Sequence, residues 1–483
     1  MTRINTNVPA LTAVNNLTAN NQSLTRSLER LSSGLRINRG ADDPAGLIAS
    51  ESLRSEIRGI STAISNSERA INVISTADAA LGEVSSLLLE LKELVVETAN
   101  DAGLSNDEIE ANQQQVDSLL VAIDRIANST QFNGKRLLDG QLGYTVSGQD
   151  KSNLARLQIF GARVPESSNL AVDVNVTQSA QTAQLTIGTG GTTGVDGTGA
   201  LSAGNGVTLE IRGNRGTTLL SFASGTTLSA IAAAVTNNAT LTGVSAVGSA
   251  GGISFNSTEY GSDQFVSVRA ISGTFGVNAG DQGDNEDRGR DAQVFINGQA
   301  ASVNGLTASI RTSGLDLVAE LSEAFGTAVG TDSFDVTGGG ANFQIGPNVN
   351  AQGRVSVGIE SITSANLGSV TNGFLSALRT GGASDLVNAE NLPQAERIVA
   401  DAITQVSTLS GRLGGFQANQ IETNLNSLRV ALENVTASES AIRDTDYSLE
   451  VSNLTRAQIL QQSTTQSLGI ANQLPQTVLS LLG

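Results

Sequence analysis

The 483-residue chain contains no His and no Cys, the side chains that most often carry out nucleophilic and metal-binding chemistry. Ser-His-Asp triads, Cys nucleophiles, disulfides and thiolate or imidazole metal sites are therefore excluded. Carboxylates gather at short spacing in the acidic loop from Asp281 to Asp287. Their oxygens suit a divalent cation, but the loop lacks the spacing of a calcium-binding loop. We favour a solvated loop whose charge Arg288 and Arg290 offset, with a cation site as the alternative, and we predict no cofactor.

Composition excludes further classes of function. The net charge of -18 argues against nucleic acid as a partner, because phosphate binding requires a basic face. Trp is absent and aromatic residues make up 3% of the chain, so rigid anchors for small-molecule pockets are scarce. The first residues lack the apolar core of a secretory signal. Any export is therefore expected to follow a route that does not cleave this end.

The C-terminal segment from Ala457 to Gly483 contains no Asp, Glu, Lys or Arg. Its apolar residues recur at spacings of three and four among Gln, Ser, Thr and Asn, which is typical of a helix. A membrane span needs roughly 20 predominantly apolar residues, and the polar run from Gln461 to Gln466 interrupts this segment. We therefore expect no membrane insertion, and a helix that is buried against other protein helices.

A heptad pattern begins near the other end of the chain. Positions Leu17, Asn21, Leu24, Leu28, Leu31 and Leu35 alternate spacings of four and three, which predicts a coiled-coil helix that ends near Gly40. Asp43 and Pro44 suit the start of a second helix of ~55 residues, ~80 Å long at 1.5 Å per residue. The segment 106–129 returns as an antiparallel helix. Beyond the tight-turn dipeptide at Asn133, a β-hairpin is expected between about 137 and 162.

The composition changes to Gly, Thr, Ser, Val and Ala from about 165 to 385, which predicts a β-rich insertion. We interpret it as two tandem ββαβ-type units, about 165–285 and 286–385. The first has strands near 207–213 and 217–222 and a helix from Leu228. The second has a hairpin around Asn297 and a helix from Ser313 to Phe325. Helical periodicity then resumes over about 390–442.

These elements predict an α+β protein in which both termini form a long helical coiled-coil and bundle core around a β-rich insertion of two small outer modules. The expected domains are 1–43 and 447–483 as inner coiled-coil helices, 44–164 and 386–446 as the bundle, and 165–385 as the outer region. Pairing of the terminal helices would leave the uncharged face of the last helix uncovered, so other copies of the chain should bury it. Such head-to-tail contacts generate an open filament.

Both ends of the chain closely resemble bacterial flagellin. The resemblance rests on Leu31-Ser-Ser-Gly-Leu-Arg-Ile-Asn38 with Asp42-Asp43-Pro44-Ala45-Gly46, on Thr130-Gln-Phe-Asn-Gly134, on Ser452-Asn-Leu-Thr-Arg-Ala-Gln-Ile-Leu-Gln-Gln462, and on Ala471-Asn-Gln-Leu-Pro-Gln476 with Val478-Leu-Ser-Leu-Leu482. It covers roughly 1–165 and 385–483. The insertion resembles the variable outer region of flagellins, on weaker motifs.

The resemblance implies a secreted, extracellular filament subunit for swimming, exported unfolded through the flagellar type III apparatus and not an enzyme. Its expected partners are other copies of itself, an export chaperone, the filament cap and the hook-filament junction proteins. Residues 1–43 and 447–483 are expected to be disordered in the monomer and to fold on assembly. The expected polymerisation residues are Leu17, Leu24, Leu28, Leu31, Leu35, Leu454, Leu468, Leu474, Val478 and Leu481.

A possible innate-receptor patch follows from the same resemblance, at Leu88, Glu90, Leu91, Lys92, Glu93 and Leu94. Strongly recognised flagellins have Arg where this chain has Glu90, which reverses the charge. The alternative interpretation is a solvated helix face with helical charge pairs.

Other functions compete with the filament subunit. A hook-filament junction protein shares the terminal helices, but the long bundles and the two-module insertion argue against it. A protease module in the insertion would need a His-Glu-x-x-His motif, which a chain without His does not have. An adhesin role for the insertion stays open.

Overall fold

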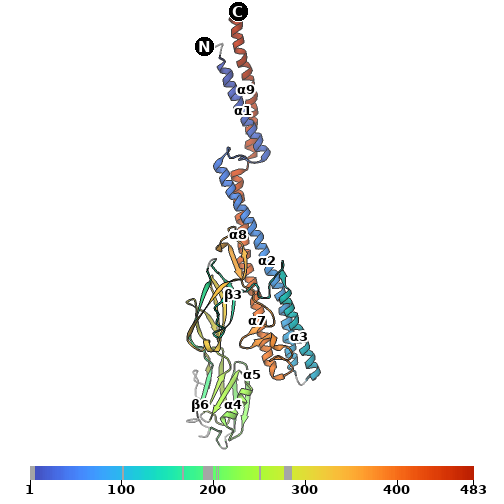
Figure 1. Cartoon of the computed structure of the whole chain (residues 1–483), viewed down its shortest axis with the longest axis vertical. Coiled ribbons are helices and arrows are strands. Elements are labelled where there is room, and N and C mark those ends of the chain that lie inside the picture. The colour runs from blue at the N-terminus through green and yellow to red at the C-terminus, as the bar shows by residue number, and fades with distance from the viewer. Residues whose placement is uncertain are drawn as a thin grey trace. The chain divides into compact units, whose positions relative to one another are not determined.

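The computed structural model describes residues 6–100, 103–165, 168–188, 199–202, 204, 206–249, 252–276 and 285–482 (Figure 1). The chain divides into two compact units. Unit 1 comprises Met1–Glu68, Ile345–Val349 and Glu422–Gly483, and unit 2 comprises Arg69–Gln344 and Asn350–Ile421. Helix α2 (Pro44–Thr98) contributes residues to both units.

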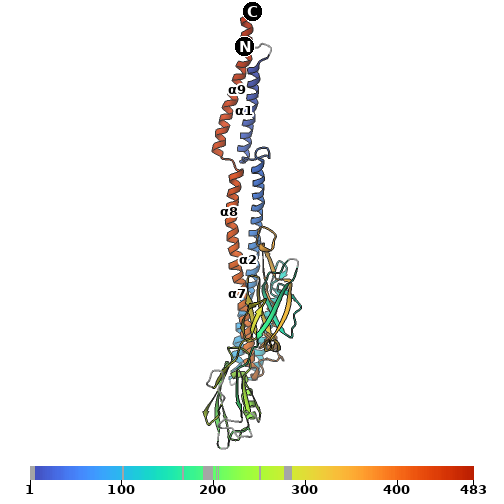
Figure 2. The same ribbon diagram turned by 90° about the vertical axis from the view of Figure 1, so that its left-hand side faces the viewer.

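In unit 1, helix α1 (Val8–Ser33) lies antiparallel beside α9 (Tyr447–Leu482), as Figures 1 and 2 both show. Helix α1 ends earlier than the sequence predicted. Gly34 adopts a left-handed conformation with φ of 73°, and its N–H donates to the carbonyl of Arg30. Because glycine tolerates this conformation without a side-chain clash, the helix stops there rather than near Gly40.

The segment between α1 and α2 is held by backbone hydrogen bonds to the C-terminal half of the chain. The N–H of Arg36 donates to the carbonyl of Arg443 at 2.7 Å, and that of Thr445 to the carbonyl of Gly34 at 2.9 Å. The Asp43 carboxylate accepts from the N–H of Gly46 at 2.9 Å, so Asp43 caps α2 as predicted.

Helix α2 packs within unit 1 against α8 (Thr423–Arg443). Ile60, Ala63 and Leu428 are buried between the two helices. Half-buried apolar residues extend this contact along both helices: Ile64, Ala431, Leu432 and Val435. The predicted spacing of three and four thus provides the packed face.

A helical bundle forms the first core of unit 2. It consists of the second part of α2, α3 (Asn106–Ser129) and α7 (Leu392–Phe416), which bury one shared apolar cluster. Helix α3 has the predicted bounds, and a capping box fixes its start, in which Ser105 and Glu108 exchange hydrogen bonds. The helix predicted over 390–442 is present, with a π-helical segment at Gln417–Glu422 between α7 and α8.

Polar side chains of α3 hold the loop segment that precedes α7. The amide of Gln113, which is buried, donates to the carbonyl of Leu378 at 2.9 Å and accepts from the N–H of Leu386 at 2.8 Å. Asp124 accepts from the N–H of Ser364 at 2.7 Å. These contacts satisfy backbone groups of a segment that has little regular structure of its own.

The inner β module is a sandwich of two antiparallel sheets that share one apolar core. The first sheet has the order β14-β13-β5-β18-β3 and the second β15-β16-β17-β4. Their bounds are β3 Tyr144–Ser147, β4 Leu154–Ala162, β5 Leu170–Gln178, β13 Gln293–Ile296, β14 Gln299–Ala300, β15 Ser302–Asn304, β16 Thr307–Arg311, β17 Leu315–Leu321 and β18 Gly330–Gly339.

The outer β module has its own core, made by two sheets and helix α4 (Leu228–Asn237). The sheet orders are β6-β10-β9 and β12-β11-β7-β8. The strands are β6 Gln184–Gly188, β7 Val207–Gly213, β8 Thr217–Phe222, β9 Val244–Ser249, β10 Gly252–Ser257, β11 Phe265–Ser272 and β12 Glu286–Arg288, and one-turn helix α5 is Ala239–Thr242.

Short elements complete the fold. They are β1 Gln131–Phe132, β2 Lys135–Arg136, α6 Glu323–Gly326, β19 Ala341–Gln344, β20 Arg354–Val357, β21 Gly368–Ser369, β22 Gly373–Phe374, and the 3-10 helices η2 Ala351–Gly353, η3 Leu375–Leu378 and η4 Ala389–Asn391. The predicted tight turn lies between β1 and β2, where Asn133 and Gly134 have positive φ.

Three predictions for the β region are wrong. No hairpin spans 137–162, because β3 pairs with β18 whereas β4 pairs with β17. The segment predicted as a helix from Ser313 is mostly strand β17, whose side chains alternate strictly between buried and half-buried. The modules are nested rather than tandem, since β5 belongs to the inner module together with β13 and β18.

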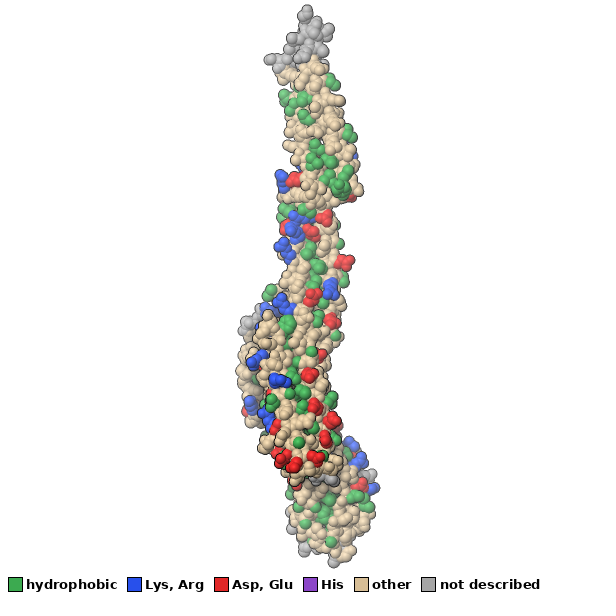
Figure 3. Space-filling model, turned by 90° about the vertical axis from the view of Figure 1, so that its right-hand side faces the viewer, with side chains coloured by type: hydrophobic (Ala, Val, Ile, Leu, Met, Phe, Trp, Pro, Cys, Tyr) green, Lys and Arg blue, Asp and Glu red, His purple; other side chains and the backbone are tan. Residues whose placement is uncertain are grey.

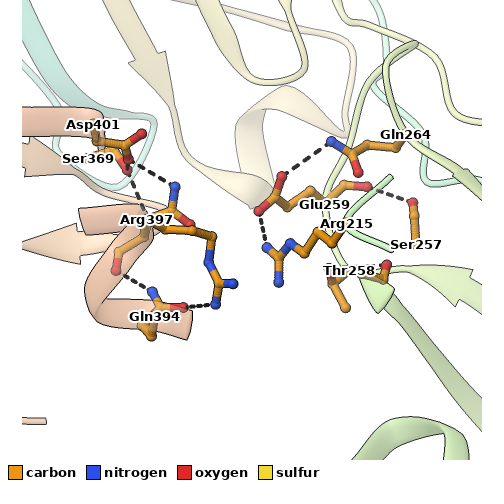
Figure 4. A network of polar contacts seen from close by, with 11 residues as sticks. Arg215, Ser257, Thr258, Glu259, Gln264, Ser369, Gln394, Arg397 and Asp401 are labelled. Atoms are coloured by element: carbon orange, nitrogen blue, oxygen red, sulfur yellow. Dashed lines mark hydrogen bonds and ion pairs between the residues drawn. The ribbon is translucent and has the colours of Figure 1, made fainter. Parts of the chain in front are cut away.

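Two groups of polar side chains, one on the outer module and one on and beside α7, face each other (Figure 4). Arg215 donates to the Glu259 carboxylate, which also accepts from Gln264 at 3.2 Å. Arg397 of α7 lies opposite this pair and donates to Gln394. Burial lowers the pKa of Arg397, the charge of Arg215 lowers it further, and that of Glu259 opposes both. Glu259 therefore forms an ion pair with Arg215 and also carries a charge that favours the protonated form of Arg397.

We predict that Glu259→Gln lowers the free energy of unfolding by about 1–3 kcal/mol, because it leaves the partly buried Arg215 without its charged partner. Urea denaturation of the full chain, followed by circular dichroism, measures this change. Glu210→Gln is the matched control, since Glu210 pairs with the exposed Arg269 in the same module, and it should cost less than about 0.5 kcal/mol. Equal losses of stability from the two substitutions would contradict the role of Glu259 as the charged partner of Arg215.

Candidate assembly surface

The seam between α1 and α9 is made of small side chains flanked by leucines. Ala13 and Ser27 of α1 and Ala457 and Ala471 of α9 are buried. The predicted residues Leu17, Leu24 and Leu31 of α1 and Leu454 and Leu468 of α9 are half-buried beside them. Small residues let two helices approach closely, so the pairing buries little apolar surface for each residue.

Polar contacts fix the antiparallel register of this pair. The Asn7 amide donates to the carbonyl of Ala471 at 2.7 Å, and the Asn20 amide to the hydroxyl of Thr464 at 3.4 Å. Near the other end, Arg30 forms an ion pair with Glu450 at 3.6 Å, and the Glu450 side chain is only 7% exposed. Because Asn7, Asn20 and Arg30 meet partners in descending order along α9, they specify one register.

Several predicted polymerisation residues lie elsewhere than in this seam. Leu28 is 50% exposed, and the predicted core Asn21 is exposed as well. The observed seam uses Asn20 and Ser27 instead, so the heptad pattern is wrong by one position at these two places. Leu35 is half-buried after the end of α1, where it forms a β-bridge with Asp444. The side chains of Leu474, Val478 and Leu481 lie outside the described residues.

Large apolar side chains remain exposed on both terminal helices. On α1 they are Val8, Leu11, Val14 and Leu28, and on α9 they are Tyr447, Leu449, Val451, Ile459, Leu460 and Ile470. Figure 3 shows hydrophobic and uncharged side chains over most of the visible face of this helix pair. A large exposed apolar surface of this kind is typical of an interaction site. Sequence periodicity detected the helices but not which of their faces stay uncovered.

The predicted receptor patch divides into a buried and an exposed part. Leu88, Leu91 and Leu94 are buried in the bundle core, so they present no surface to a partner. Glu90 and Glu93 are exposed and Lys92 is half-buried. Glu90 accepts from Gln115 at 3.2 Å. The accessible part is therefore acidic, and the exposed Leu89 and Val96 beside it were not singled out by the sequence.

The acidic loop offers no assembled cation site among the described residues. Asp281 and Asp284 lie outside those residues. Asp287 is buried, and its carboxylate accepts from the N–H of Gln184 at 2.7 Å. Within the described ranges, no helix has the length and apolarity required to cross a membrane.

Comparison with known proteins identifies both ends of the chain. Residues 4–142 match the family model described as bacterial flagellin N-terminal helical region, and residues 397–482 match the bacterial flagellin C-terminal helical region. Flagellin from Clostridium tyrobutyricum is 29% identical over 97% of this chain and 99% of its own length. Flagellin from Salmonella muenchen is 29% identical over 99% of each chain. Flagellin from Bacillus subtilis (strain 168) is 39% identical over 36% of this chain and 56% of its own length.

The absence of native cysteine allows a clean test of the α1–α9 register. We predict that the pair Asn20→Cys and Thr464→Cys forms an intramolecular disulfide in the assembled polymer, because these side chains are in contact and a disulfide needs Cα atoms within about 7 Å. Non-reducing electrophoresis detects the bond. Thr18→Cys with Thr464→Cys is the control, since Thr18 is exposed on α1. Equal oxidation of both pairs would contradict the register.

Proposed function

This chain belongs to the bacterial flagellin family and is a structural subunit of the flagellar filament in swimming motility. We therefore propose that other copies bury the exposed faces of α1 and α9 during polymerisation. The observation that carries this proposal is the uncovered apolar surface on a segment without a single charge from Ala457 onward. Its role is mechanical rather than catalytic. We expect Leu17, Leu24, Leu31, Leu454 and Leu468 to stabilise the pair, and Leu28 and Ile459 to contact other copies.

Burial of these side chains supplies the driving force for assembly. Each large apolar side chain that becomes fully covered contributes roughly 1.5–3 kcal/mol, which is an upper estimate when the disordered state is already compact. Several side chains together offset the conformational entropy that is lost when the terminal segments become ordered. Contacts between different faces of successive copies do not close on themselves, so the polymer is an open helix.

We also propose a route by which the subunit reaches the filament. The chain is exported unfolded through the flagellar type III apparatus, with the help of a chaperone, and is incorporated outside the cell beneath the filament cap and beyond the hook-filament junction proteins. Absence of Cys, and therefore of disulfides, fits passage as an unfolded chain. No observation favours the alternative role of a junction protein.

We also propose that a host innate receptor binds this subunit weakly. The exposed part of the 88–94 segment carries Glu90 and Glu93. The resemblance to strongly recognised flagellins implies Arg at the position of Glu90. A reversed charge at the centre of a contact adds repulsion and removes a strong anchor type.

We predict that Ile459→Asn prevents or strongly slows seeded polymerisation, because it places an amide in the apolar contact, and that it leaves the stability of the bundle unchanged. Sedimentation of polymer after addition of filament seeds measures the effect. Leu219→Asn is the matched control, since Ile459 and Leu219 are both 61% exposed but Leu219 lies on the outer module. Normal polymerisation of the Ile459→Asn chain would contradict the assembly surface.

We further predict that residues 1–43 and 447–483 are disordered in dilute monomer. Their amides should exchange with deuterium at rates close to those of an unfolded chain, and should become protected in the polymer. Amides of α3 serve as an internal control, because its core packing is complete within the chain. Protected amides in the terminal segments of the monomer would refute coupled folding and assembly.

A further inference from the structure

A cleft of about 990 Å³ lies within unit 2, between the inner β module and the C-terminal end of α7. Its walls come from the end of β4, the turn between β16 and β17, the segment around β20 and the last turns of α7. These segments are distant in sequence and meet only in the folded chain. The assembly surface on α1 and α9 does not include any of them.

Four arginines line this cleft, each from a different element. Arg163 follows β4, Arg311 ends β16, Arg354 begins β20 and Arg412 belongs to α7. Asp316 is the single carboxylate among the residues that line it. In a chain with a net charge of -18, this is a strongly basic site.

Asp316 is already engaged by two of the four guanidinium groups. One carboxylate oxygen accepts from Arg311 at 3.0 Å and the other from Arg412 at 2.9 Å. Arg412 also lies over the ring of Phe160, 3.6 Å from its centroid, which holds the guanidinium group in place. Burial lowers the pKa of Arg412, and Asp316 opposes this shift. A second anion in the cleft would stabilise the charged form further.

The wall formed by α7 contains two glycines, which leave the cleft open. Gly411 and Gly415 line it, although glycine weakens a helix relative to alanine. A Cβ atom on Gly411 would meet no heavy atom within 4 Å, so close packing does not require glycine there. Gly414 is equally free of contacts but does not line the cleft.

We propose that this cleft is a binding site for a multivalent anion that carries carboxylate or phosphate groups. Guanidinium groups bind the paired oxygens of such ligands through two parallel hydrogen bonds. Arg163 provides an available anchor, since its guanidinium group makes no ion pair within the described part of the chain. The ligand is either a soluble anion or the acidic side chains of a second copy of this chain.

Calorimetric titration of the full-length monomer with citrate, and separately with inorganic phosphate, tests the site at constant ionic strength. Binding of citrate that weakens at least tenfold in Arg163→Gln supports it. The backbone N–H of Arg163 still donates to the carbonyl of Gly314 in this variant, so the strand end is retained. Arg125→Gln, which removes an exposed charge from α3, should bind like the original chain. Absence of binding, or equal loss in both variants, would overturn the proposal.

A second pair of variants tests the shape of the cleft. Gly411→Ala should weaken citrate binding several-fold and Gly414→Ala should not, while both should raise the thermal stability of the helix. Equal citrate affinity in the two variants would overturn the proposal. Seeded polymerisation with citrate then distinguishes the ligand sources. Slower growth that Arg163→Gln reproduces without citrate identifies a second copy, whereas unchanged growth identifies a soluble anion.

Discussion

The terminal helices α1 and α9 carry large apolar side chains that a single chain leaves exposed, and the remaining structure depends on this constraint. Helices α1 and α9 pair through alanines, Ser27 and a few half-buried leucines, and this pairing leaves side chains such as Leu11 and Ile470 in water. The last 27 residues contain no Asp, Glu, Lys or Arg side chain that would favour exposure of this surface to water. Pairing fixes the register of the two helices, and in our proposal further copies of the chain bury the side chains that stay exposed. Under this proposal, assembly is a continuation of folding for this part of the chain.

Unit 2 does not share this dependence. The bundle of α2, α3 and α7 and the two β modules each have a core of fully buried side chains. Polar contacts inside this unit are also satisfied locally, as for Gln113 and Asp124 of α3. Such a unit can fold without the burial that, in our proposal, other copies provide to the terminal helices. The stability of the subunit therefore resides in unit 2, whereas in our proposal its affinity for the filament resides in the terminal helices.

Local signals in the sequence predicted the helices well. The cap at Asp43 and spacings of three and four placed α2 and α3 to within one or two residues, whereas the capping box at Ser105 became apparent only in the structure. Sheet partners were not predictable in the same way, because β5 pairs with β13 and β18 across more than 100 residues. Strand β17 was predicted as a helix because Ser313-Gly314 was interpreted as a helix start. Its buried residues Leu315, Leu317, Ala319 and Leu321 instead follow the period of two that is typical of a strand. The leucine pattern predicted Asn21 and Leu28 in the α1 seam. In the structure Asn20 and Ser27 lie there instead, and because both are polar, apolar periodicity does not detect them.

Electron cryomicroscopy of filaments grown from seeds and purified monomer shows whether neighbouring copies cover the exposed faces of α1 and α9. We predict density in which the exposed faces of α1 and α9, including Leu28 and Ile459, lie against helices of neighbouring copies. Filaments in which these faces remain in contact with solvent, and in which the contacts between copies involve only unit 2, would contradict it.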